Sequence, residues 1–181
     1  MQWERSLVQR ERSLIQSRAG CYIILPHGEA AMDLPKSGVV VCDENLCTGC
    51  GVCELMCSLS HDAMTGPALS RVHIAHDPFA DHVNFYGCGQ CASPGCYSAC
   101  PLPGEALCID ELTGARYIDA DECIGCGICV ESCSLEPARV RFNEDKNVAF
   151  KCDLCRGRDG GPVCVEYCGY GALRFVPRDE R

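Results

Sequence analysis

The chain has 181 residues, a formal net charge of −9 and 19 cysteines. Its hydrophobic fraction of 47% counts cysteine as apolar, and aromatic residues make up only 7%. This low content of large apolar side chains excludes an enzyme that is built on a conventional hydrophobic core. Disulfides or bound metal must therefore stabilise the fold.

The first predicted element is an N-terminal arm, residues 1–36. Residues 4–10 recur almost unchanged as 11–17, and this period of seven places apolar residues on one helical side. Two heptads are too few for a stable solitary coiled coil, so we expect an arm that is poorly ordered or bound by a partner. The alternative is that these residues result from an upstream start codon and that translation begins at Met32. The chain shows neither a signal peptide nor an apolar run that spans a bilayer, which predicts a cytoplasmic protein with reduced thiols and no membrane insertion.

Sixteen cysteines fall into four groups of four. The first and third groups have the spacing C-x2-C-x2-C-x3-C, the ferredoxin signature of a [4Fe–4S] cluster. The second group has spacings of x2, x4 and x3, and the fourth has spacings of x2, x8 and x3. The groups are Cys47, Cys50, Cys53 and Cys57; Cys88, Cys91, Cys96 and Cys100; Cys123, Cys126, Cys129 and Cys133; and Cys152, Cys155, Cys164 and Cys168.

The shape of a cluster explains this spacing. Three cysteines separated by two residues lie on a tight loop around the cubane, and the fourth begins a helical turn that carries it to a neighbouring cluster. Glycines in these loops, such as Gly49 and Gly125, permit positive φ and let amide N–H groups approach the sulfurs. Zinc held by four thiolates is the alternative, and it stays open for the fourth group, whose x8 loop is the least diagnostic.

Short strand-like runs precede all four groups and follow three of them. Strand, cluster loop, helical turn and strand make one half of a ferredoxin. The first group lacks its trailing strand in the usual place, and turn signals occupy the segment 58–82. We therefore predict an α+β fold of two tandem bacterial-ferredoxin-like modules, loop-rich and stabilised by clusters. The runs are 39–41, 84–86, 117–119 and 148–150 before the groups, and 106–109, 138–142 and 172–175 after them.

The order of the four motifs resembles the iron–sulfur subunits of the dimethyl sulfoxide reductase and formate dehydrogenase type. The segment 47–61, C-T-G-C-G-V-C-E-L-M-C-S-L-S-H, is similar to the small electron-transfer subunits of tungsten aldehyde oxidoreductases and class II benzoyl-CoA reductase. This resemblance implies nested pairing, the first group with the fourth and the second with the third, whereas spacing alone also allows sequential pairing. The implied ligand sets are Cys47, Cys50, Cys53 and Cys168; Cys57, Cys152, Cys155 and Cys164; Cys88, Cys91, Cys96 and Cys133; and Cys100, Cys123, Cys126 and Cys129. The implied division is an outer module of 37–83 and 143–177, an inner module of 84–142, and a tail of 178–181.

A [4Fe–4S] cluster with four cysteine ligands exchanges one electron and leaves no iron site for a substrate. The chain has no dinucleotide fingerprint, P-loop or nucleophile elbow, so we predict no catalytic residue and up to four clusters that conduct electrons. The resemblance implies a catalytic tungsten or molybdenum pterin subunit as partner, together with a further electron-transfer subunit or ferredoxin. A free soluble polyferredoxin is the alternative, and a zinc-stapled interaction module is a third interpretation. The acidic charge argues against nucleic acid.

Eight further residues match no ligand spacing. We interpret Cys21, Cys42 and Cys108 as small buried hydrophobic residues. Four of the five histidines fall in 61–82, and we interpret this segment as a solvated or partner-facing connection, not a metal site.

Overall fold

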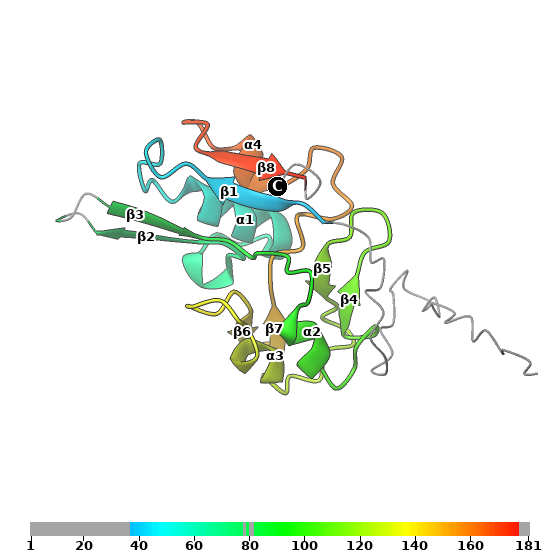
Figure 1. Ribbon diagram of the computed structural model, residues 1–181. Helices are drawn as coiled ribbons and strands as arrows, with labels where there is room; N and C mark the ends of the chain where they lie inside the picture. The colour runs from blue at the N-terminus through cyan, green and yellow to red at the C-terminus, as the bar shows by residue number, and fades with distance from the viewer. Residues whose placement is uncertain (1–36, 78, 80–81, 178–181) are drawn as a thin grey trace, which may run out of the picture.

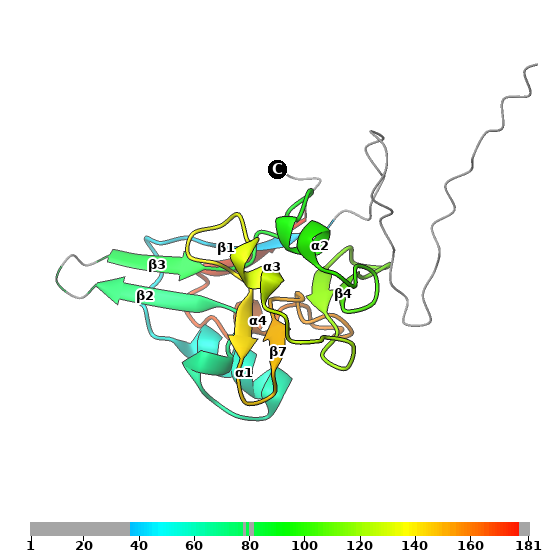
Figure 2. The same cartoon turned by 90° about the horizontal axis from the view of Figure 1, so that it is seen from below.

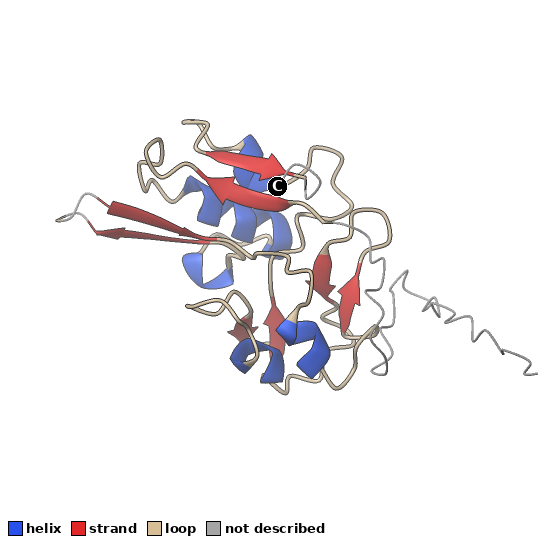
Figure 3. Cartoon of the chain, viewed as in Figure 1, coloured by secondary structure: helices blue, strands red, loops and turns tan. Residues whose placement is uncertain are grey.

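The computed structural model describes residues 37–77, 79 and 82–177, so the predicted arm 1–36 and tail 178–181 lie outside the described residues. Short strands and short helices alternate with loops (Figure 3), which confirms the predicted α+β, loop-rich fold. None of the helices in this part of the chain has the length and apolar content that crossing a bilayer requires. The elements are β1 (Val39–Cys42), α1 (Val52–Asp62), the 3-10 helix η1 (Pro67–Leu69), β2 (His73–Asp77), β3 (His82–Tyr86), α2 (Gly95–Ala99), β4 (Leu107–Ile109), β5 (Arg116–Ile118), α3 (Ile128–Glu131), β6 (Arg141–Asn143), β7 (Val148–Phe150), α4 (Val163–Glu166) and β8 (Leu173–Val176).

The first and last described strands pair with each other. β1 and β8 run antiparallel, with Val39 opposite Val176 and Cys42 opposite Leu173. Val40 and Leu173 are buried in one core cluster with cysteines of α1 and α4, and these two helices pack together behind the strand pair in the view of Figure 1. The beginning and end of the described chain therefore form one unit, which joins the first cysteine group to the fourth.

The inner part of the chain builds a second core. β4 pairs with β5, β6 pairs with β7, and α2 lies against α3 (Figure 2). Leu107 and Ile109 are almost fully buried there, together with Tyr97 and Val140. Ala149 of β7 packs in the same cluster, so the β6–β7 hairpin contributes to the inner core. This hairpin crosses residue 143, where the sequence led us to expect the second part of the outer module to begin.

A long hairpin of β2 and β3 projects from the body in both views (Figures 1 and 2). We expected a strand at 84–86, and we expected the first cysteine group to lack its trailing strand in the usual place. β2 is that missing strand, displaced because α1 continues to Asp62 and η1 follows it. Glu54 fixes its position, since the carboxylate of Glu54 accepts hydrogen bonds from the Ile74 amide at 3.2 Å and from Nδ1 of His73 at 2.7 Å.

Candidate metal centres

Site 1 is a cavity lined by Cys47, Cys50, Cys53 and Cys168. The loop that carries its first two cysteines passes through positive φ at Gly49 and Gly51. Gly51 is also the N-cap of α1, and its carbonyl accepts the Glu54 amide, so the helix begins directly after the loop and presents Cys53 in its first turn. Cys168 arrives from the segment after α4, so this cavity contains cysteines of the first and fourth groups.

Site 4 repeats this construction at the other end of the molecule. It is a cavity lined by Cys100, Cys123, Cys126 and Cys129. Its loop has positive φ at Gly125 and Gly127, and Gly127 is the N-cap of α3. A side chain at position 125 would place its Cβ 2.4 Å from the backbone oxygen of Asn147, so only glycine fits there. Cys100, the C-cap of α2, brings the second group to the third.

Site 3 is a cavity lined by Cys88, Cys91, Cys96 and Cys133. The packing of α2 on α3 brings Cys96 close to Cys133, which follows α3. Three cationic side chains line the same cavity, and two of them, Arg116 and Lys151, are buried. The third, Arg139, donates its backbone amide to Sγ of Cys133 at 3.2 Å.

Site 2 is formed by Cys57, Cys152, Cys155 and Cys164. The first, second and last of these pack in one buried cluster, and Cys155 lies beside His61, which also contacts Cys57. The turn between Cys152 and Cys155 contains no glycine, and Leu154 and Cys155 themselves take φ values of 59° and 53°. Such a conformation is unfavourable for side-chain-bearing residues. The carboxylate of Asp153 stabilises it by accepting the Cys155 amide at 2.9 Å.

His61 joins α1 to this strained turn. Its Nδ1 donates to the carbonyl of Cys57 at 2.8 Å, and its Nε2 donates to the carboxylate of Asp153 at 2.9 Å. Both partners only accept hydrogen bonds, so both bonds form together in the imidazolium. Burial opposes this charge, but hydrogen bonding to Asp153 and to the thiols of Cys155 and Cys57 raises the pKa of His61 well above its ordinary value. For Asp153, burial acts in the direction of a higher pKa, because it disfavours the charged carboxylate. The hydrogen bond from His61 outweighs burial, and the pKa of Asp153 is lowered.

The donor sets fit [4Fe–4S] clusters. Each site offers four thiols, and backbone amides point at the sulfurs: the Arg71 amide lies 3.3 Å from Sγ of Cys57, and the Val163 amide lies 3.4 Å from Sγ of Cys155. Burial, followed by the charges of Glu54, Cys47 and Cys50, raises the pKa of Cys53 to about 12. Four thiolates therefore stay together only around a cationic core, which iron supplies.

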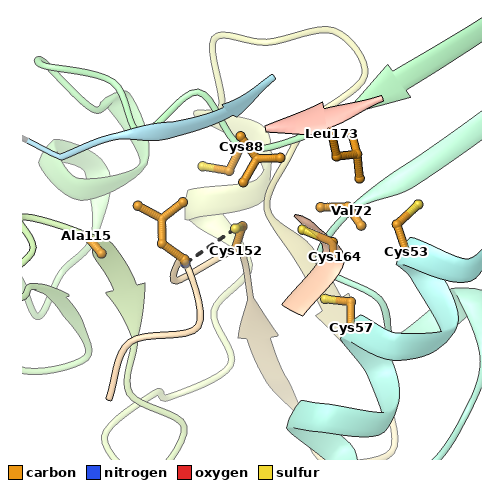
Figure 4. Close-up of a cluster of buried hydrophobic side chains, with 10 residues drawn as sticks. Cys53, Cys57, Val72, Cys88, Ala115, Cys152, Cys164 and Leu173 are labelled. Carbon is orange, nitrogen blue, oxygen red and sulfur yellow. Dashed lines mark hydrogen bonds between the residues drawn. The ribbon is translucent and has the colours of Figure 1, made fainter. Parts of the chain in front are cut away.

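The four sites lie in a single row. Cys53 of site 1, three cysteines of site 2 and Cys88 of site 3 pack in one core cluster, and Cys96 of site 3 packs with Cys129 of site 4 in the next. Figure 4 shows Cys152 of site 2 beside Cys88. Both lie on one side of Cys164, and Cys53 of site 1 lies on the other side. The charge of Cys88 also raises the pKa of Cys152 after the larger effect of burial. The spatial order is therefore site 1, site 2, site 3 and site 4.

The two ends of the row reach the surface. Cys50 of site 1 and Cys126 of site 4 are exposed, whereas all four cysteines of site 2 are buried. Exposed apolar side chains flank both ends, and they are more numerous beside site 1. They are Leu46, Val52 and Tyr170 beside site 1, and Ile124 and Ile128 beside site 4. Both ends thus combine a reachable thiol with an apolar surface.

Sequence reasoning located the cysteines and missed the polar residues around them. The interpretation of His61 as part of a solvated or partner-facing connection is wrong, because it contacts two cysteines of site 2. Its position four residues after Cys57 on a helix was the available signal. Cys108 is fully buried beside Tyr117, which confirms its interpretation as a small hydrophobic residue; Cys42 is half-buried, and Cys21 lies outside the described residues.

These features define a class of protein, one that binds [4Fe–4S] clusters through cysteine thiolates and transfers electrons. A family model described as a 4Fe-4S dicluster domain matches residues 83–178. The chain belongs to this family, and the iron–sulfur cofactor and the resemblance expected from the motifs are confirmed.

Similar proteins are subunits of oxidoreductases. The chain is 38% identical over 139 residues to the polyferredoxin-like subunit of aliphatic sulfonate oxidoreductase from Pyrococcus furiosus, covering 75% of each chain. It is 30% identical over 162 residues to a formate dehydrogenase iron-sulfur subunit from Haemophilus influenzae, covering 76% of this chain and 51%, about half, of that protein. A chain of the solved active-site complex BamBC of benzoyl coenzyme A reductase with benzoyl-CoA aligns with a TM-score of 0.47 and 27% identity, over 78% of this chain and 80% of that one. This chain is an iron–sulfur electron-transfer protein of the oxidoreductase-subunit kind.

Proposed function

We propose that the protein is a relay subunit that passes electrons between a catalytic tungsten or molybdenum pterin subunit and a second redox partner, with one [4Fe–4S] cluster in each of sites 1 to 4. The ligand sets proposed are those of the nested pairing. The observation that carries the proposal is the single row of four all-cysteine sites with an exposed thiol at each end. The printed names of the sulfonate oxidoreductase and formate dehydrogenase relatives support an oxidoreductase partner.

Bound clusters supply one-electron exchange without a substrate-binding iron. The chain's own residues hold the thiolates at fixed positions and aim amide donors at them, as the Arg71 and Arg139 amides do at Cys57 and Cys133. Apolar side chains exclude water from the middle of the row. Electrons therefore exchange with partners at the two exposed ends.

We assign the site 1 end to the catalytic subunit. Permanent subunit interfaces are rich in apolar and aromatic side chains. Leu46 is 50% exposed and Tyr170 59%, both beside site 1, and Val52 lines the same cavity, whereas site 4 offers two isoleucines. The smaller apolar surface at site 4 suits a partner that binds and leaves.

Affinity purification of the tagged chain, expressed with its neighbouring genes under anaerobic conditions, tests this proposal. We expect a large pterin-containing chain to co-purify, with about sixteen irons and sixteen acid-labile sulfides per copy of this chain. Tyr170→Asp should release the large chain. The matched variant Ile124→Asp should retain it and slow electron exchange with the second partner. A native protein that elutes alone would favour the free polyferredoxin, and a colourless protein with about four zincs would contradict both electron-transfer functions.

A further inference from the structure

A buried polar junction lies between site 2 and site 3. The ammonium of Lys151 donates to the carbonyl of Arg116 and, at 3.3 Å, to the carbonyl of Cys152. The Gln90 side chain links the same two residues, since Nε2 donates to the Cys152 carbonyl at 2.7 Å and Oε1 accepts the Arg116 amide at 2.7 Å. Gln90 is 1% exposed, Arg116 2% and Lys151 4%, so water does not screen the charges of this junction.

Among the residues that the structure describes, no carboxylate pairs with the ammonium of Lys151. Both of its hydrogen bonds go to carbonyl oxygens, and within the described part of the chain no acidic side chain forms an ion pair with it. Burying a cation without an anion is costly. Lys151 lines the site 3 cavity, and its charge opposes the burial that raises the pKa of Cys96. The anionic group that the structure places beside Lys151 is therefore the thiolate set of site 3.

Among the described residues, the other sites have fewer cationic side chains around them. At site 2 the His61 imidazolium is paired with Asp153, so the two charges cancel. In the described chain, no charged side chain lines the cavity of site 1 or site 4. Site 3 has three cations around it: Lys151, Arg116 and Arg139.

We propose that Lys151, supported by Arg116 and Arg139, makes site 3 the site of highest reduction potential in the row. This inference rests on the proposed function, because it takes site 3 to hold a cluster. Reduction adds one negative charge to a cluster, and a cation in a poorly screened position stabilises the reduced form. The first electron to enter the row therefore rests at site 3. The relay then stores one electron between its ends, and its two partners need not be docked at the same moment.

The test is a redox-poised electron paramagnetic resonance titration of the anaerobically purified, fully loaded protein. One cluster should be reduced clearly before the others in the wild type. Lys151→Met should lower the ratio of reduced to oxidised cluster for this species at least ten-fold at fixed ambient potential, which for a one-electron couple is a shift of about 59 mV. Lys151→Arg, which keeps the charge, should restore it. Lys146→Met is the matched control, because Lys146 is 61% exposed and pairs with Asp62, and it should leave the species unchanged.

Two further variants make the outcome decisive. Cys91→Ser alters a proposed site 3 ligand and should change or remove the same early-reduced signal. If Lys151→Met loses iron, Lys151→Gln removes the charge while keeping a donor for the carbonyls. The inference is overturned if a neutral, fully loaded variant leaves the first potential unchanged, if all potentials shift equally, or if the early signal survives Cys91→Ser. A wild-type protein that does not accept four electrons would instead contradict the proposed function.

Discussion

Replacing His61 with alanine should loosen the contact between α1 and the turn that carries Cys155. The side chains of His61 and Asp153 are 15% and 20% exposed, so their hydrogen bond is largely protected from water. The substitution leaves the Asp153 carboxylate and the Cys57 carbonyl without this donor. Hydrogen bonds to charged groups contribute about 1.5–3 kcal/mol each. With a discount for partial exposure we expect a loss of about 2 kcal/mol, or roughly 30-fold in the local opening equilibrium.

The assay is the loss of visible cluster absorbance after an iron chelator is added to the loaded protein under anaerobic conditions at neutral pH. When opening and closing are fast, the chelator reaches iron at a rate proportional to the open population. His61→Ala should therefore bleach about 30-fold faster than wild type in its fastest phase. The control is His73→Ala, which removes a 2.7 Å bond to Glu54 from a side chain that is 49% exposed, and it should change the rate by less than about five-fold. A His61→Ala rate no faster than that of the control would show that His61 does not hold α1 to this turn.

Two other predictions concern the stability of the fold. Complete removal of iron under reducing conditions should unfold the chain, because each site cross-links distant segments, and an unchanged circular dichroism spectrum would contradict this. Gly95→Ala should destabilise the inner core by about 1–3 kcal/mol, since a Cβ there would lie 2.6 Å from the carbonyl oxygen of Ser132; this is measured as faster bleaching by chelator. Gly66→Ala is its control, because a Cβ there meets nothing within 4 Å, and equal rates for the two variants would count against the steric argument.

The regular part of this architecture was predictable from the chain because cluster loops have strict local requirements. The C-x2-C-x2-C-x3-C spacing predicted a cluster loop followed by a helical turn, but it placed the start of that turn at the fourth cysteine. The helices α1 and α3 begin before the third cysteine, directly after Gly51 and Gly127. The short apolar runs predicted the strands next to the loops. These signals are local, and a single sequence displays them.

The rest depends on contacts between distant segments. The β2 strand (His73–Asp77) was missed because its sequence is rich in histidine and its place is set by the carboxylate of Glu54, far away in sequence. The position of Lys151 in the lining of the site 3 cavity has no signal in spacing, since a lysine before a cysteine is unremarkable until the inner core folds around it. Cysteines therefore predict where iron binds, whereas the residues that adjust each site become visible only in three dimensions.

The most direct test of the account is an anomalous-scattering map, recorded at the iron and zinc absorption edges from crystals of the anaerobically purified protein. We expect four iron clusters in one row. Cys168 should bind the cluster of the first cysteine group, Cys57 that of the fourth group, and the third cluster should lie beside Lys151. Fewer iron clusters, zinc at site 2, or ligation of each cluster by one sequential group would contradict it.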